Sequence, residues 1–161
     1  MPKTLTVVIG APCSGKTLYI QNHILPNSPA GIELFDLKNL HTLGRIIRYL
    51  KAAAWEKKEE IIVEGFFPNP RSRRLLIEFA HNNDYVPKVI FINSTLEQCL
   101  AWNKKRDEIN PGTGTPTPIL RKAFASMEKP TYYEGFASVT EIIQKEEEEE
   151  VKVEGKEIEN G

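Results

Sequence analysis

The sequence has few residues of the kinds that build disulfide frameworks or structural zinc sites. Its 161 residues include only two cysteines, Cys13 and Cys99, which are too few for either. The three histidines, His23, His41 and His81, show no metal-ligand spacing. No apolar run approaches membrane-spanning length, and the first residues lack the layout of a signal peptide. We therefore expect a cytoplasmic protein without a membrane partner.

Acidic residues are concentrated in one part of the chain, so the formal net charge of −1 conceals an asymmetry. Residues 144–161 contain eight glutamates and three lysines, a net charge of −5, whereas residues 1–143 contain 18 basic and 14 acidic residues, a net charge of +4. A mildly basic body suits an anionic substrate without singling out nucleic acid. Because the glutamate run repels itself and buries nothing, we expect one folded domain over 1–143 and an acidic, disordered tail over 144–161. A short hairpin at 151–158 is the alternative.

Apolar periodicity predicts alternating strands and helices. Short apolar runs predict buried strands at 5–9, 31–36, 60–63 and 87–92, with an edge strand at 136–143. Longer amphipathic runs predict helices at 17–25, 40–58, 71–82, 95–109 and 117–127. This alternation indicates a doubly wound α/β sheet with right-handed crossovers. Such sheets bind ligands beyond the carboxyl ends of their strands.

A phosphate-binding motif joins the first predicted strand to the first predicted helix. The motif G-x-x-x-x-G-K-[ST] is matched by Gly10, Ala11, Pro12, Cys13, Ser14, Gly15, Lys16 and Thr17. Its glycines allow backbone conformations that let successive amides surround an anion. Lys16 is expected to reach the β- and γ-phosphates of a nucleotide, and Thr17 to bind Mg²⁺. The alternative is a glycine turn with an incidental lysine, which the flanking strand and helix disfavour.

Two acidic residues end predicted strands and should meet the phosphate loop in one cleft. Asp36 ends the second strand, where a carboxylate can accept the proton of an attacking hydroxyl. Glu64 ends the third strand, where it can hold a Mg²⁺-bound water or orient Lys16. The alternatives are that Asp36 caps a turn and that Glu64 is a solvated loop residue.

Basic residues precede the proline- and glycine-rich loop at 110–118. Lys104, Lys105 and Arg106 close the helix before that loop, and the segment at about 103–127 can form a mobile lid. Arg106 is expected to close over the transferring phosphoryl group. The alternative is a solvated helix end whose charges complement the helix dipole.

Further basic residues could bind an acceptor molecule. We assign this role weakly to Lys38, Arg71, Arg73 and Arg74. Arginines at the start of a helix oppose its dipole, which mildly favours a ligand role, but a solvated face is the alternative that we favour.

Four aromatic residues are interpreted mainly as core residues. Phe66 and Phe67 are either core residues or a platform on which a base stacks, and we favour the core. Trp55 and Trp102 lie on predicted helices and are expected to pack in the core.

These residues together resemble the kinase domain of polynucleotide 5′-hydroxyl kinases, over roughly residues 5–143. Asp36 lies twenty residues after Lys16, as in that family. The segment IIVEGFFPNPRSRR (61–74) resembles the family's strand that ends in an acid and is followed by Asn-Pro and arginines. Arg106 is similar to its lid arginine, and the Pro-Thr and Glu-Gly-Phe of residues 130–136 resemble the closing signature of eukaryotic-type members.

The resemblance implies a three-layer P-loop kinase fold with a mostly parallel central sheet of four to five strands and a helical lid. It implies ATP as phosphoryl donor, Mg²⁺ as cofactor, and the 5′-hydroxyl end of DNA or RNA as acceptor. The phosphatase domain that often accompanies such kinases is not expected, because the chain has three aspartates and no Asp-x-Asp pair.

The sequence departs from the family on the acceptor side. Phe35 stands where the family usually has arginine, Asn39 where some members have arginine, and Glu64-Gly65 where an aspartate is usual. Two alternatives therefore stay open. One is a small-metabolite or nucleoside kinase of the same fold, and the other is a non-catalytic nucleotide-binding module.

Overall fold

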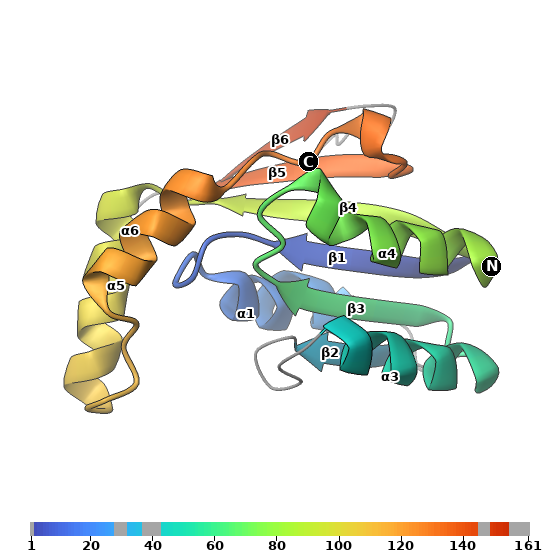
Figure 1. Ribbon diagram of the computed structural model, residues 1–161, viewed down its shortest axis with the longest axis horizontal. Helices are drawn as coiled ribbons and strands as arrows, with labels where there is room; N and C mark the ends of the chain where they lie inside the picture. Colours follow the sequence, from blue (N-terminus) through green and yellow to red (C-terminus); the bar gives the residue numbers. More distant parts are fainter. Residues whose placement is uncertain (1, 28–31, 37–42, 145–148, 155–161) are drawn as a thin grey trace.

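The chain folds around a six-stranded sheet with the strand order β2-β3-β1-β4-β5-β6 (Figure 1). The computed structural model describes residues 2–27, 32–36, 43–144 and 149–154. The strands are β1 (Lys3–Ile9), β2 (Ile32–Asp36), β3 (Glu60–Gly65), β4 (Tyr85–Asn93), β5 (Ser138–Gln144) and β6 (Glu149–Glu154). Strands β1 to β5 are parallel, and β6 is antiparallel to β5. The predicted α/β fold with a mostly parallel sheet is confirmed.

Helices follow most of these strands, at positions close to those predicted. They are α1 (Lys16–Tyr19), which continues as η1 (Ile20–Ile24) and η2 (Leu25–Asn27), α3 (Leu43–Trp55), α4 (Pro70–Asn82), α5 (Leu96–Ile109), α6 (Thr117–Ser126) and η3 (Tyr132–Glu134). The starts of α4 and α5 are each set by a capping box, formed by Asn69 with Ser72 and by Thr95 with Gln98.

The helices cover both faces of the sheet, which explains why β1 is a continuous apolar run. Val7 packs in one core with Ile46 of α3 and Leu76 of α4, whereas Val8 packs in a second core with Ile20 of η1. The helices α5 and α6 pack together beyond the carboxyl ends of the strands (Figure 1). The molecule is thus a three-layer sandwich with a helical lid at one end of its sheet.

The acidic segment after β5 contributes a strand, which corrects part of the prediction. Glu149–Glu154 pairs with β5, and Gln144, which we had assigned to a disordered tail, is the last residue of β5. Disorder is therefore wrong for residues 144 and 149–154, while 145–148 and 155–161 lie outside the described residues. The physical reason is that β5 would otherwise be an open edge, whose backbone groups favour pairing with the alternating sequence EEVKVE.

Arg73 is a structural residue, and its predicted role in acceptor binding is wrong. Its side chain is fully buried, and Nη1 donates to both Glu134 carboxylate oxygens at 2.9 and 3.1 Å. Nε donates to the Phe67 carbonyl oxygen at 3.0 Å, and Nη2 to that of Glu128. A guanidinium enclosed in this way cannot contact an acceptor, so Arg73 instead ties α4 to the segment before β5.

Replacement of Arg73 should therefore cost stability. We expect Arg73→Leu to lower the free energy of unfolding by about 3–5 kcal/mol, because the Glu134 carboxylate is left buried without its partner. Arg74→Ala, at the exposed neighbouring position, should change it by less than about 0.5 kcal/mol. Urea unfolding followed by circular dichroism measures both, and similar effects of the two variants would contradict this assignment.

Candidate functional site

The loop between β1 and α1 adopts a conformation that depends on its glycines. Gly15 has a φ of +94°, and Cys13 a φ of +64°, both in the left-handed region. A Cβ on Gly10 would lie 2.6 Å from Ser14 Oγ and 2.9 Å from the backbone oxygen of Ile92, so no larger residue fits there. The motif thus folds as a tight loop at the carboxyl edge of the sheet, as predicted.

The loop residues fit the phosphates of a nucleotide. Lys16 Nζ donates to the carbonyl oxygens of Gly10 and Ala11, both at 3.0 Å, so the ammonium lies against the loop. Within the described residues, Ser14 Oγ is the one fully buried side-chain oxygen or nitrogen without a hydrogen-bond partner. A cation held over a glycine loop that encloses an unsatisfied hydroxyl is suited to a multiply charged oxyanion.

Thr17 at the start of α1 and Glu64 near the end of β3 come together, in the cleft where the sequence predicts them. Thr17 Oγ1 donates to the Glu64 carboxylate, at 2.8 and 3.0 Å from its two oxygens, and Glu64 is 7% exposed. A hydroxyl and a carboxylate are hard oxygen ligands that suit Mg²⁺. No cluster of three or more His, Cys, Asp or Glu side chains that could hold a metal occurs in the described part of the chain. These residues therefore fit a Mg²⁺ ion that takes its other ligands from water and phosphate.

Asp36 ends β2 at the same edge of the sheet. Its Cα is in register with that of Glu64 on β3, which is itself in register with Val8 of β1. The structure describes the backbone of Asp36 and not its side chain, and Lys38 lies outside the described residues.

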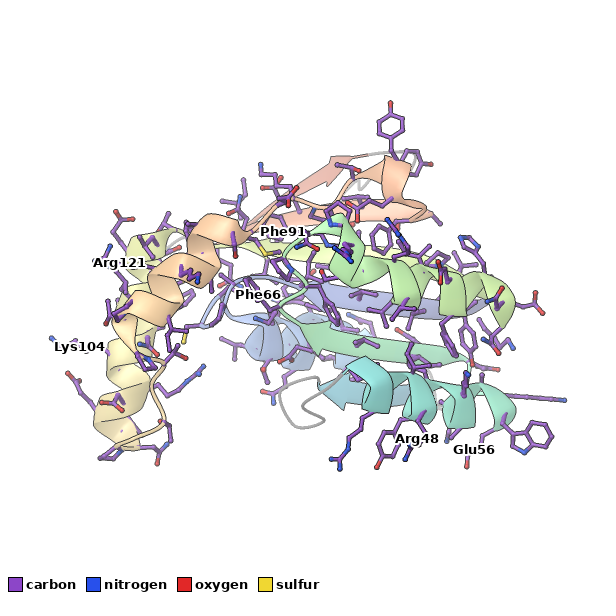
Figure 2. The ribbon with its side chains drawn as sticks, in the orientation of Figure 1. Arg48, Glu56, Phe66, Phe91, Lys104 and Arg121 are labelled. Carbon is purple, nitrogen blue, oxygen red and sulfur yellow. The ribbon has the colours of Figure 1, made fainter. Side chains whose placement is uncertain are left out.

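A cavity of about 670 Å³ connects the phosphate loop to the lid. Besides loop residues 12–17, it is lined by Leu18, Gln21, Glu64, Gly65, Phe66, Trp102, Arg106, Thr115 and Gln144. Arg106 thus faces the loop across the cavity, whereas Lys104 and Lys105 do not line it. Figure 2 shows Lys104 on the outer side of α5. Since neither lysine lines the cavity, both fit the alternative that these charges belong to a solvated helix end.

Seven of the lining residues were not among the predicted site residues, and three of them, Trp102, Phe66 and Gln144, were interpreted differently from the sequence. Trp102 was assigned to the core, yet it lies one helical turn before Arg106 and lines the cavity. Of the two phenylalanines after β3, Phe67 is buried in the core and Phe66 lines the cavity between sheet and lid (Figure 2). Gln144 was placed in the tail. The helical spacing of Trp102 and Arg106 is the one signal that could have revealed a lining residue.

Asn103 connects the lid to the phosphate loop. Its Oδ1 accepts from the backbone N–H of Thr115 at 2.7 Å, and its Nδ2 donates to the Thr115 carbonyl oxygen at 2.6 Å. The Cys13 thiol donates to the same Oδ1 at 3.4 Å. The buried amide of Asn103 thus connects Thr115, between α5 and α6, to Cys13 of the phosphate loop.

An apolar cluster lies behind this connection. Cys13 and Cys99 pack with Leu120 of α6, and both cysteines are free. Burial and, to a smaller extent, the neighbouring Cys13 raise the pKa of the Cys99 thiol while Lys16 lowers it, and the resulting pKa is about 11. Cys99 is therefore a neutral packing residue at physiological pH.

Comparison with known proteins identifies the fold. No family model matches the chain. It is similar to Chaetomium thermophilum Kti12 in complex with ADP-AlF3, at 18% identity and a TM-score of 0.61, covering 84% of this chain and 86% of that one. It is also similar to a chain of the Pnkp1/Rnl/Hen1 RNA repair complex, at 13% identity and a TM-score of 0.62 over 78% of this chain. A third similar structure is the AvrRxo1-ORF1:-ORF2 complex with ATP, at 12% identity and a TM-score of 0.66 over 93% of this chain.

The chain spans 44% and 57% of the length of the latter two chains. Together with the phosphate loop, these likenesses define the class: the chain has the fold of P-loop kinases, which is a nucleotide-binding fold. Among the described residues, no helix combines the length and apolar character that crossing a membrane requires.

Loss of the Asn103 amide should loosen the lid selectively. In Asn103→Leu the backbone groups of Thr115 lose both side-chain partners, so we expect amide hydrogen exchange in residues 110–115 to become at least about tenfold faster. Lys104→Ala, at the exposed next position, should leave these rates unchanged. Mass spectrometry after deuterium exchange measures them, and equal acceleration in β1 and β4 would show that the variant is destabilised as a whole instead.

Proposed function

We propose that the protein is an ATP- and Mg²⁺-dependent kinase that phosphorylates the 5′-hydroxyl end of DNA or RNA. One observation carries this proposal: a single cavity is lined by Lys16 and Thr17 of the phosphate loop, by Glu64 at a strand end, and by Arg106 of the lid. A cation and a metal-binding pair on one side, with a second cation on the other, suit a phosphoryl group in transfer.

The donor side of the site assigns a role to each of these residues. Residues 10–17 would hold the phosphates of ATP, with the Lys16 ammonium on the β- and γ-phosphates. Thr17 would bind Mg²⁺ directly and Glu64 through water. The metal would neutralise charge on the phosphate oxygens. Arg106 is exposed on α5 and lines the cavity, so its guanidinium can approach the transferring group when the lid closes.

Asp36 would accept the proton of the acceptor hydroxyl. The register of β2 with β3 supports this role, because it sets Asp36 beside Glu64 at the edge where the phosphate loop lies. An acceptor bound next to β2 and β3 would have its hydroxyl between this carboxylate and the terminal phosphate, which is the arrangement that in-line transfer requires.

A basic surface supports nucleic acid as the acceptor. Arg71 and Arg74 are exposed at the start of α4. Helix α3 covers the same face of the sheet as α4, and the exposed Arg48 projects from it (Figure 2). The first turns of both helices contain no acid. Arg71 and Arg74 at a helix start are unfavourable to the helix dipole, and a bound anion such as a phosphate backbone would offset this. A chain of the RNA repair complex is also among the similar structures.

A small-metabolite or nucleoside kinase is the second candidate. The acceptor side favours it, because Phe35 and Asn39 stand where the polynucleotide kinases carry arginines. Phe66 beside Glu64 offers a single aromatic face, which is enough for one base or an apolar group.

Replacement of Asp36 should separate turnover from nucleotide binding. We expect Asp36→Asn to lower kcat by at least about 100-fold, because the amide cannot accept the hydroxyl proton, while the Kd for ATP stays within about twofold. Asp84→Asn is the control, since Asp84 is an exposed turn residue whose φ of +61° asparagine also tolerates. Single-turnover kinetics and calorimetry measure the two quantities, and full turnover in Asp36→Asn would remove Asp36 from its role.

An acceptor screen tests the proposal as a whole. Labelled ATP is incubated with the full chain and a 5′-hydroxyl oligonucleotide, a nucleoside or a sugar. Transfer to the oligonucleotide supports the proposal, and transfer only to a small acceptor supports the second candidate. ATP binding without transfer to any of them would indicate a non-catalytic nucleotide-binding module.

Removal of two exposed charges should affect a polynucleotide acceptor specifically. We expect the double variant Arg71→Ala/Arg74→Ala to raise KM for the oligonucleotide and to make the salt dependence of log KM shallower by up to about 2 units, with KM for ATP unchanged. The double variant Lys104→Ala/Lys105→Ala removes the same charge from exposed positions of α5 that do not line the cavity, and it should leave both KM values unchanged. If replacement of the two arginines left the KM for the oligonucleotide unchanged, these arginines would not contact the acceptor.

A further inference from the structure

The cavity has two ends, because the strands that border it lie on opposite sides of β1. The sheet order sets β3 on one side of β1 and β4 and β5 on the other. Glu64, Gly65 and Phe66 line the cavity from the end of β3, next to β2 and Asp36. Gln144 lines it from the end of β5. The β3 end is the side of the proposed acceptor, so the β5 end is available to the nucleoside part of the donor.

Gln144 presents a hydrogen-bonding group at the β5 end of the cavity. The residue is only 7% exposed and lines the cavity, and its amide forms no hydrogen bond with another residue in the described part of the chain. The amide oxygen and nitrogen lie 2.9 and 3.1 Å from the position that a Cβ on Gly15 would occupy. The amide is thus held in a nearly buried side chain yet borders the cavity, where it is available to hydrogen-bond a ligand.

The surroundings of this amide suit a flat apolar ring. Leu18 and Gln21 follow Gly15 at intervals of three residues, and both line the cavity. Leu18 is 59% exposed. Trp102 lines the cavity from α5. An apolar surface, an aromatic ring and one amide with both a donor and an acceptor are what a nucleobase site requires.

We propose that Gln144 hydrogen-bonds the base of the donor nucleotide and makes the site prefer adenine. This inference rests on the proposed function, since it requires a nucleotide with its phosphates on residues 10–17. The amide oxygen accepts from the adenine 6-amino group while the amide nitrogen donates to N7. Guanine presents two acceptors at that edge, so it leaves one half of the amide unsatisfied.

The test measures binding rather than turnover. Calorimetry with the full chain gives Kd values for ATP, for GTP, for purine riboside triphosphate, which lacks the 6-amino group, and for inorganic tripolyphosphate. The wild-type protein should bind ATP about tenfold more tightly than either GTP or purine riboside triphosphate. Gln144→Leu should weaken ATP by about tenfold, abolish this preference and leave tripolyphosphate unchanged. Thr140→Val, on the same strand and away from the cavity, should match the wild-type values.

The outcomes separate this inference from the function on which it rests. Equal wild-type affinities for ATP, GTP and purine riboside triphosphate would overturn the role of Gln144 even if Gln144→Leu failed to fold, because they need no variant. A full adenine preference in folded Gln144→Leu would overturn it as well. In both cases a tight ATP complex would leave the proposed kinase intact. A wild-type protein that binds neither ATP nor tripolyphosphate would overturn both proposals.

Discussion

The left-handed backbone of the phosphate loop is the constraint on which the rest of the site depends. A non-glycine residue at positive φ, as at Cys13, costs on the order of 1–3 kcal/mol and persists only when its surroundings hold it. The loop is held from three directions. Glu64 of β3 accepts from Thr17, Ser94 after β4 donates to the Ser14 carbonyl oxygen, and Asn103 of the lid accepts from Cys13. The sheet and the lid are therefore positioned relative to one another through the loop that would bind the phosphates.

The positions of residues at strand ends could be predicted from the sequence, because the carboxyl ends of parallel strands lie at the same edge of the sheet. Thr17 and Glu64 are 47 residues apart, yet both follow apolar strands, and parallel strands end at one edge. Arg73 shows where charge patterns are insufficient. Its neighbours Arg71 and Arg74 are exposed, but Arg73 is in helical step with Leu76 and is buried against Glu134. Of these three arginines, one is therefore structural and two are exposed. The helical period of the sequence indicates this difference, whereas the composition alone does not.

The composition of the acidic segment concealed both a strand and a site residue. Repulsion between glutamates argues against a buried core in this segment. A strand at the edge of a sheet, however, needs only backbone pairing and an alternation of apolar and charged residues, which Val151 and Val153 provide in the sequence. Pairing of β6 also gives β5 a neighbour on its outer side up to Gln144, which pairs with Glu149. The end of β5 is consequently part of the sheet, and Gln144 reaches the phosphate loop from a paired strand rather than from a disordered tail.

The division of the cavity explains how the sequence can keep one half of a kinase site and alter the other. In the proposed kinase, the donor would occupy the part of the cavity next to the β1 loop and β5, which Lys16, Thr17 and Gln144 line. The acceptor half is built on β2 and β3, which lie on the other side of β1. The departures from the family pattern at positions 35, 39, 64 and 65 fall in or shortly after β2 and β3 in the sequence, and among them Glu64 forms a hydrogen bond with Thr17 of the loop. In the proposed kinase, residues around β2 and β3 would therefore select the acceptor, while the β1 loop would keep the nucleotide.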